Sequence, residues 1–227
     1  MCALLFGLAL ALRLAGLTWG LPTAERWYSL HPDERQIAIA VAGLDFFGGD
    51  FNPDFYNYPS LAIYLAYFMH GIGALFGVFG ATQTPFGLLS DLVMSGRLVT
   101  AFLGAATAPL VFLVAREVVI AHSGHQNRVA ALAGILMALS PGHLQHSHFA
   151  TVDVPATFFI TLCLWLSVRT MNNAARQRTR LLILAALAAG LAAATKYNAG
   201  LVALAPIVAA WLPSQAMPGE STTEKPH

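Results

Sequence analysis

The sequence "RLVTAFLGAATAPLVFLVARE", residues 97–117, contains no charged side chain between Arg97 and Arg116. A helix needs about 20 predominantly apolar residues to cross the hydrocarbon core of a bilayer, and this stretch has that length. The whole chain shares its character, since 57% of the residues are hydrophobic, 10% are charged and the mean hydropathy is +0.63. Soluble domains carry roughly 25% charged residues. The sequence therefore predicts an integral membrane protein built from apolar helices.

Further candidate spans lie on both sides of this stretch, at residues 1–20, 60–80, 129–142, 154–170, 181–195 and 198–212. The first could be a secretory signal, but it lacks a positive start and Arg13 interrupts it, so we treat it as a membrane helix. We expect Arg13 to snorkel or to pair within the bundle, with Asp33 or Asp91 as candidate partners. The predicted fold class is all-α: a polytopic transmembrane bundle of about six spans over residues 1–212, followed by a polar tail, 213–227, expected to be disordered.

Charge and cysteine content exclude several classes of protein. The formal net charge is +1 and there is no long basic run, so a nucleic-acid partner is not expected. Cys2 and Cys163 both fall in apolar stretches, which indicates neither a disulfide framework nor a thiolate metal site.

Arginines give the orientation, because cytoplasmic loops are enriched in positive charge. Arg116 and Arg128 flank one loop, and "RTMNNAARQRTR", residues 169–180, holds four arginines in another. Placing both loops inside puts residues 140–155 at the outer face of the plasma or inner membrane. The parity of the crossings then predicts that residues 60–80 form an interfacial or re-entrant helix at the outer surface. The alternative is that residues 60–80 cross and the charge signal misleads.

On this topology, ionisable side chains from three separate loops gather on the outer side. Charges near hydrocarbon are costly, so those that are present there are functional candidates. "LHPDERQ", residues 30–36, has a proline followed by acids, which is typical of a helix start. The carboxylates could merely stabilise that helix N-terminus. The whole set is His31, Asp33 and Glu34 in the first loop, His143, His146, His148 and Asp153 in the second, and Lys196 in the third.

The histidines of "HLQHSH", residues 143–148, have a second interpretation. His143 and His146 are spaced to face one way on a helix, and with Asp153 they could bind a divalent cation. Histidines in outer loops are more often hydrogen-bonding groups. We therefore assign no metal ligand and predict no cofactor firmly, while a divalent cation stays an alternative.

Several motifs, in this order, resemble a known family. They are "LHPDE", then "GGDFNPDFYNYPSLAIYL", then "SGRLVTAFLGAATAPLVFLVARE", then "SPGHLQHSHFATVDVPATFF" and "AAATKYNAG". Together they are similar to the membrane-embedded GT-C glycosyltransferases of the protein O-mannosyltransferase and aminoarabinose-transferase type. The resemblance covers residues 1 to about 212. Members of that family generally have more spans, so the chain is expected to be the N-terminal part of such an enzyme, and it could be inactive as a fragment.

The resemblance implies a transferase that moves a sugar from a polyprenyl-phosphate carrier to a protein, lipid or glycan acceptor at the outer or luminal face. It implies that Asp33, with Glu34 beside it, acts at the acceptor, and that Asp153 is the second outer-loop acid. Lys196, Arg97 and Tyr58 are the candidates for donor and phosphate binding. Tyr58 stands in "NYPS", where the family has the lysine of "KP".

The chemistry of the residues is compatible with the same roles. A hydroxyl that attacks an anomeric carbon needs a base for its proton, and the departing phosphate needs positive charge. A single displacement inverts the anomeric centre, so we predict inversion. The alternative functions are a membrane transporter segment and a non-catalytic membrane scaffold. The transporter would place ionisable groups near the midplane of several helices.

Overall fold

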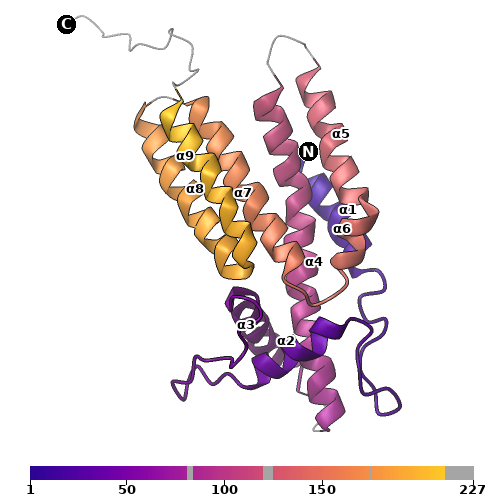
Figure 1. Ribbon diagram of the computed structural model, residues 1–227. Coiled ribbons are helices and arrows are strands. Elements are labelled where there is room, and N and C mark those ends of the chain that lie inside the picture. Colours follow the sequence, from indigo (N-terminus) through magenta and orange to yellow (C-terminus); the bar gives the residue numbers. More distant parts are fainter. Residues whose placement is uncertain (81–83, 120–124, 174, 213–227) are drawn as a thin grey trace, which may run out of the picture.

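The computed structural model of the protein describes residues 1–80, 84–119, 125–173 and 175–212, and the main elements of these residues are helices (Figure 1). The order is α1 (Cys2–Leu14), α2 (Pro32–Ala42), α3 (Leu61–Leu75), α4 (Pro85–Val118), α5 (Gln126–Leu139), α6 (Pro141–His146), α7 (Asp153–Met171), α8 (Ala175–Thr195), the 3₁₀ helix η2 (Tyr197–Ala203) and α9 (Leu204–Trp211). The described residues contain no strand, and Asp45 and Asp50 form an isolated bridge. The all-α prediction is confirmed.

Three of the described helices are long and apolar enough to cross a membrane: α4, α7 and the Gln177–Thr195 part of α8. The segments expected at residues 1–20, 129–142 and 198–212 correspond to Cys2–Leu14, Gln126–Leu139 and Tyr197–Trp211, which belong to the shorter apolar helices. They run alongside the long helices in one bundle (Figure 1). About six spans were expected, and helix length supports three of them.

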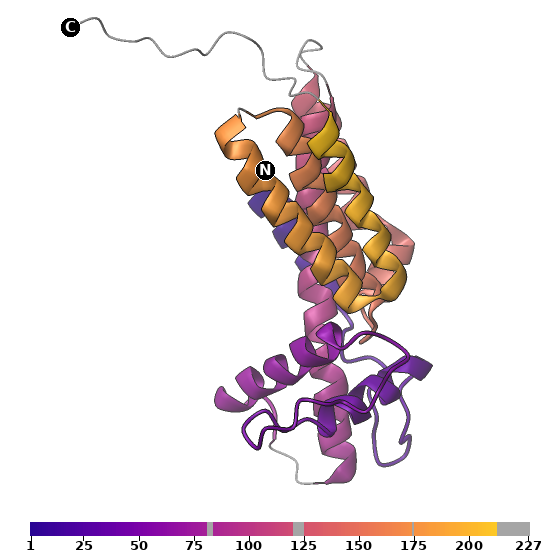
Figure 2. The ribbon, with the colours of Figure 1, turned by 60° about the vertical axis from the view of Figure 1, so that its left-hand side comes forward.

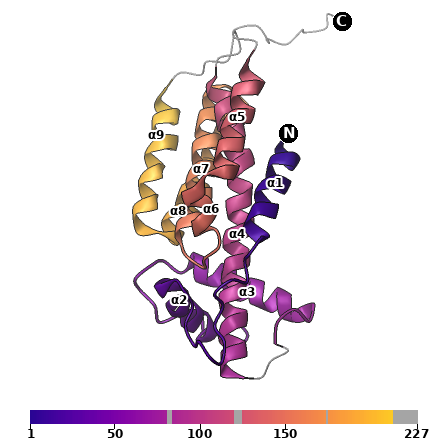
Figure 3. The same cartoon turned by 90° about the vertical axis from the view of Figure 1, so that its right-hand side faces the viewer.

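The central element is α4, which is longer than the sequence predicted. Thr84 caps its start by accepting a hydrogen bond from the Gly87 N–H, and Pro85 occupies the first turn. Its 34 residues span about 50 Å at 1.5 Å per residue, well beyond the roughly 30 Å of a bilayer core. The N-terminal part therefore projects from the bundle, and α2 and α3 pack against it (Figures 1 and 3).

Helix α3 lies across the projecting part of α4 instead of running along it (Figures 2 and 3). Its buried face, formed by Ala62, Ile63 and Ala66, packs with α2 and α4. At 15 residues it belongs to the shorter apolar helices. The interfacial or re-entrant position predicted for residues 60–80 stays a prediction.

Small side chains allow the helices of the bundle to approach closely. Ala9 of α1, Ala105 and Ala108 of α4 and Ala138 of α5 are fully buried in one cluster. Large apolar side chains point outward, among them Leu136, Leu187 and Trp211, as expected for a surface that faces lipid. The interior is thus a helix-packing core, and the charged residues of interest lie at its ends.

Candidate functional site

The first-loop acids lie at the start of α2, as the sequence predicted. Pro32 occupies the first turn, and the His31 ring accepts a hydrogen bond from the Asp33 N–H at 3.3 Å between nitrogens. The Asp33 side chain is half-buried, and it accepts a hydrogen bond from the Tyr58 hydroxyl at 3.2 Å. Glu34 points the other way and is fully buried. The two adjacent carboxylates therefore have different environments.

Glu34 forms a buried bidentate ion pair with Arg97 of α4. The Nε and Nη2 atoms of Arg97 lie 2.7 and 2.8 Å from the two carboxylate oxygens, and both side chains are at most 1% exposed. Glu34 also accepts the backbone N–H of Ala150 at 2.8 Å, while Arg97 donates to the carbonyls of Leu17 and Trp19. This pair joins α2, α4, the segment after α1 and the loop before α7.

Asp153 and Lys196 form a second ion pair at the ends of α7 and α8. Asp153 is in the first turn of α7, and Lys196 follows the last residue of α8. Their side chains are 46% and 34% exposed, in contrast to the buried pair. The sequence had placed these two residues in separate outer loops, and the structure brings them into contact.

Tyr58 lies within electrostatic reach of both groups. Burial raises the pKa of Tyr58, and the charge of Asp33 and the hydrogen bond to Asp33 raise this pKa further. The charge of Asp153 also raises it, whereas the charge of Lys196 lowers it. Since Asp33 donates no proton when ionised, the tyrosine hydroxyl is the donor in the contact. Residues from the first, second and third predicted outer loops therefore converge around Tyr58.

The predicted histidines do not act alike. The His143 Nδ1 atom lies 2.8 Å from Nη2 of Arg13, and both ring nitrogens of His148 contact backbone carbonyls, of Leu144 and Ala15. His146 is exposed. Within the described ranges no group of three or more His, Cys, Asp or Glu side chains is arranged to hold a metal ion. The divalent cation remains an untested alternative.

Arg13 was expected to snorkel or to pair within the bundle, and it does pair within the bundle, but the candidate partners Asp33 and Asp91 are wrong. Arg13 is fully buried and contacts His143 and Ser147, whereas Asp91 accepts the Gly80 N–H. Asp33 and Asp91 were chosen for their charge, but the partners of Arg13 outside α1 come from the end of α5, from α6 and from Ser147 just after it. A buried arginine inside an apolar helix was the available signal that α1 contacts a polar segment.

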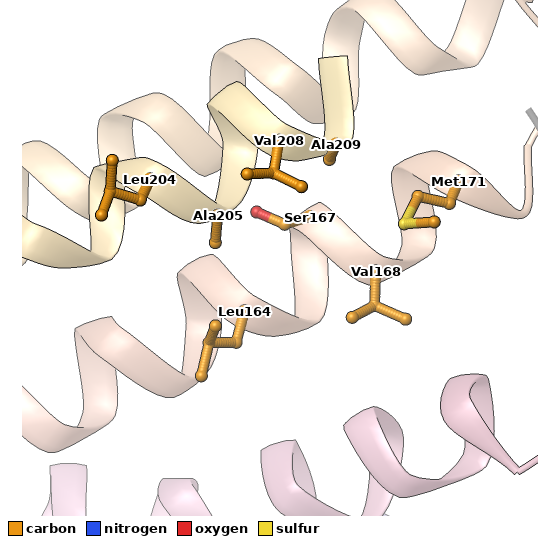
Figure 4. A pocket seen from close by; sticks show the side chains of 8 residues that line it. All are labelled: Leu164, Ser167, Val168, Met171, Leu204, Ala205, Val208 and Ala209. Atoms are coloured by element: carbon orange, nitrogen blue, oxygen red, sulfur yellow. The ribbon is translucent and has the colours of Figure 1, made fainter. Parts of the chain in front are cut away.

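An apolar pocket of about 340 Å³ lies between α7 and α9, away from these charges (Figure 4). Leu164, Val168 and Met171 face Leu204 and Val208 across it. Its one polar side chain, Ser167, already donates to the Cys163 carbonyl at 2.8 Å. This pocket offers no group for chemistry, so the candidate site is the converging set of charged side chains.

A bundle of apolar helices, three of them long enough to cross a bilayer, is typical of the class of integral membrane proteins. Residues 55–218 match the family model of dolichyl-phosphate-mannose-protein mannosyltransferases. The chain belongs to this family. The matched range includes Tyr58, Arg97, Asp153 and Lys196 and begins after Asp33, whose role stays a prediction.

A relative from Aquifex aeolicus (strain VF5), an uncharacterized protein, is 36% identical over 112 residues. The aligned region covers 49% of this chain and 21% of that protein, so the chain corresponds to a small part of the relative's length. No solved structure matches the chain.

Proposed function

We propose that this chain carries active-site residues of an inverting membrane glycosyltransferase. The enzyme takes a sugar from a polyprenyl-phosphate carrier at the outer face and transfers it to an acceptor hydroxyl. The family description favours mannose as the sugar and a protein as the acceptor, with a lipid or glycan as the alternative acceptors. The observation that carries the proposal is the convergence of Asp33 and Tyr58 with Asp153 and Lys196 at one end of an apolar bundle.

The proposed roles follow from exposure and charge. The acceptor oxygen bonds to the anomeric carbon while the bond from that carbon to the phosphate oxygen breaks with its electron pair. The acceptor proton passes to the Asp33 carboxylate, which is partly accessible. Lys196 is also accessible, so the phosphate can replace Asp153 as its partner and be stabilised as charge develops.

Glu34 and Arg97 suit a supporting role better than a reacting one. Each is buried, and each already has several hydrogen-bond partners. A donor phosphate could reach Arg97 only by displacing Glu34 into an environment without a counter-charge, which costs several kcal/mol. We therefore propose that this pair holds the first loop against α4, and that Lys196 binds the phosphate.

The arrangement of the arginines supports an outer-face site. Arg116 is in the last turn of α4, Arg169 is in the last turn of α7, and Arg128 and Arg178 lie near the starts of α5 and α8. These positions are at the opposite end of the helices from Asp153. Positive charge marks the cytoplasmic side, so the site would face outward.

The transporter and scaffold alternatives receive no specific support. A transporter would place ionisable groups near the midplane of several helices, yet α7 has none between Asp153 and Arg169. A scaffold needs no ion pair that joins two loops at the membrane surface. Both alternatives predict that a membrane preparation containing this chain will not release carrier phosphate.

The test is transfer of labelled sugar from a polyprenyl-phosphate donor pool by membranes that contain the chain, compared with Asp33→Asn. This variant keeps the shape of the side chain and removes the base, so the rate is expected to fall by a factor of about a hundred or more. Asp54→Asn is the matched control, because Asp54 is an exposed acid of the same loop region, and it should retain the parental rate. Equal rates for the parent and Asp33→Asn would contradict the role of Asp33.

Two further results would count against the proposal. A product that retains the anomeric configuration of the donor would exclude the single displacement. A parent that transfers no sugar, although it is folded in the membrane, would show that this chain alone does not support the reaction.

A further inference from the structure

Arg13 is a charged side chain placed inside an apolar helix and shielded completely from solvent. A buried arginine is costly in a membrane protein unless polar groups surround it. None of the ion pairs in the described part of the chain includes Arg13. Polar groups of neighbouring segments must therefore satisfy its donors.

The guanidinium is satisfied by four groups from three segments. It donates to the carbonyls of Ala9 at 2.9 Å and Ala138 at 3.4 Å, to the Ser147 hydroxyl at 3.1 Å, and to His143 Nδ1 at 2.8 Å. A guanidinium has donors but no acceptor, so His143 must accept through an unprotonated Nδ1. Burial lowers the pKa of His143 to about 4, and the charges of Arg13 and His146 act in the same direction. The neutral histidine is thus the form that fits this contact.

Ser147 connects this cluster to α4. Its hydroxyl accepts from Arg13 and donates to the His143 carbonyl at 2.7 Å, while its own carbonyl accepts from Thr100 of α4 at 3.2 Å. Gly104 of α4 lies directly opposite, since a Cβ there would be 2.5 Å from the Ser147 oxygen and 2.9 Å from Arg13 Nε. The contact leaves no room for a side chain at residue 104, so Arg13 and Ser147 pack directly against the backbone of α4.

The segment that follows Ser147 contacts the neighbours of Asp33. The Phe149 ring lies 5.2 Å from the ring of His31, the residue that caps the helix turn of Asp33. The Ala150 N–H binds Glu34, the residue next to Asp33. Residues 147–150 are therefore held by Arg13 at one end and support the start of α2 at the other.

We propose that Arg13 is a positioning residue of the site. From within the bundle it fixes residues 147–150 against α2 and so orients the helix turn that carries Asp33. The statement about residues 147–150 is independent of the reaction, whereas its consequence for catalysis rests on the proposed function. Arg13 itself does not touch the reacting atoms.

The experiment compares the parent with Arg13→Lys and Ser147→Ala in lipid nanodiscs. Lysine keeps the charge of Arg13 but lacks the planar guanidinium that reaches four partners. Ser147→Ala removes one of the hydrogen-bond acceptors of Arg13, and it serves as the test if Arg13→Lys does not fold. Arg116→Lys is the matched control, since Arg116 is exposed at the far end of α4. Hydrogen exchange of the peptide that covers residues 147–153 and steady-state transfer kinetics are measured on the same samples.

The expected result is faster exchange at residues 147–150, by a factor of about ten, because the variants lose a charge-assisted hydrogen bond that holds this segment. Exchange in α7 and α8 should be unchanged. The kcat should fall by about tenfold or more, because small displacements of a catalytic group are costly, with the donor KM within about twofold of the parental value.

Three results would overturn the proposal: unchanged exchange at residues 147–150, faster exchange spread evenly over all helices, or a change in donor KM without a change in kcat. The exchange arm does not depend on turnover. If the parent transfers no sugar, the proposed function fails, and faster local exchange in Arg13→Lys would still support the fixing of residues 147–150.

Discussion

The buried Glu34–Arg97 pair predicts a large loss of stability for Glu34→Gln. Glutamine keeps an acceptor for the Ala150 N–H but removes the charge opposite an arginine that is 1% exposed. Leaving one partner of a buried pair uncompensated costs about 3–5 kcal/mol. At roughly 2–4 °C per kcal/mol for a chain of this size, the apparent Tm should fall by about 6–20 °C.

The assay is thermal unfolding of the detergent-purified protein, followed by intrinsic tryptophan fluorescence. Glu117→Gln is the matched control, because Glu117 pairs with Arg169 at 3.7 Å and both side chains are partly exposed. An exposed pair contributes at most about 1 kcal/mol, so the control should lower the apparent Tm by less than about 4 °C.

A double variant separates the pair from its surroundings. Arg97→Met removes the cation, so adding Glu34→Gln to it should cost less than Glu34→Gln costs alone, with a coupling of roughly 0.5–3 kcal/mol. Similar shifts for Glu34→Gln and Glu117→Gln, or full additivity in the double variant, would refute the reasoning that Glu34 is an essential counter-charge.

Three further predictions concern single side chains of the site. Lys196→Met should raise the donor KM by about tenfold or more, because a charge-assisted hydrogen bond contributes roughly 1.5–3 kcal/mol; an unchanged KM in steady-state kinetics would remove Lys196 from the donor site. Tyr58→Phe keeps the ring and removes the hydroxyl bound to Asp33, so kcat should fall by about tenfold, whereas a rise in donor KM alone would place Tyr58 at the donor. The folded-state pKa of His143 is about 4 against 6.5 for a free histidine, so its contribution to stability is complete above about pH 6.5 and is lost as the pH falls toward 4. The apparent Tm of the parent should therefore fall as the pH is lowered from 7 to 5. His143→Asn keeps an acceptor for Arg13 and does not titrate, so its apparent Tm should fall less. Equal decreases in the apparent Tm of the parent and of the variant would contradict this cause.

Local sequence patterns correctly predicted those features that depend on neighbouring residues along the chain, such as the start of a helix. Pro32 followed by two acids predicted the start of α2, and the helix begins there. Ile37 and Val41, at helical spacing, form its buried face. By contrast, the hydropathy of residues 97–117 did not reveal that α4 begins at Pro85. Hydropathy reports preference for lipid, whereas the buried residues just before Arg97, among them Leu92 and Val93, pack against α2 and α3 instead.

The pairing of charges could not be predicted from sequence, because it depends on which helices meet. Asp153 and Lys196 were both expected on the outer face, yet nothing in the local patterns indicated that α7 and α8 would place them in contact. Arg97 was a candidate for phosphate binding, and the structure gives it Glu34 as a partner. Choosing partners by charge alone also failed for Arg13, whose hydrogen bonds go to uncharged groups.

The two ion pairs of the site differ in a way that bears on how such a site could work. In the buried pair, an incoming phosphate would have to compete with a bidentate carboxylate while leaving Glu34 unpaired, so exchange of partners is unfavourable. In the exposed pair, solvent screens both charges and little is lost when Asp153 releases Lys196. A transferase needs one cation that exchanges partners in each catalytic cycle. It also needs residues that keep the rest of the site in a fixed position. In the function proposed above, the Glu34–Arg97 pair would meet the second requirement, and the partly exposed Lys196 would meet the first.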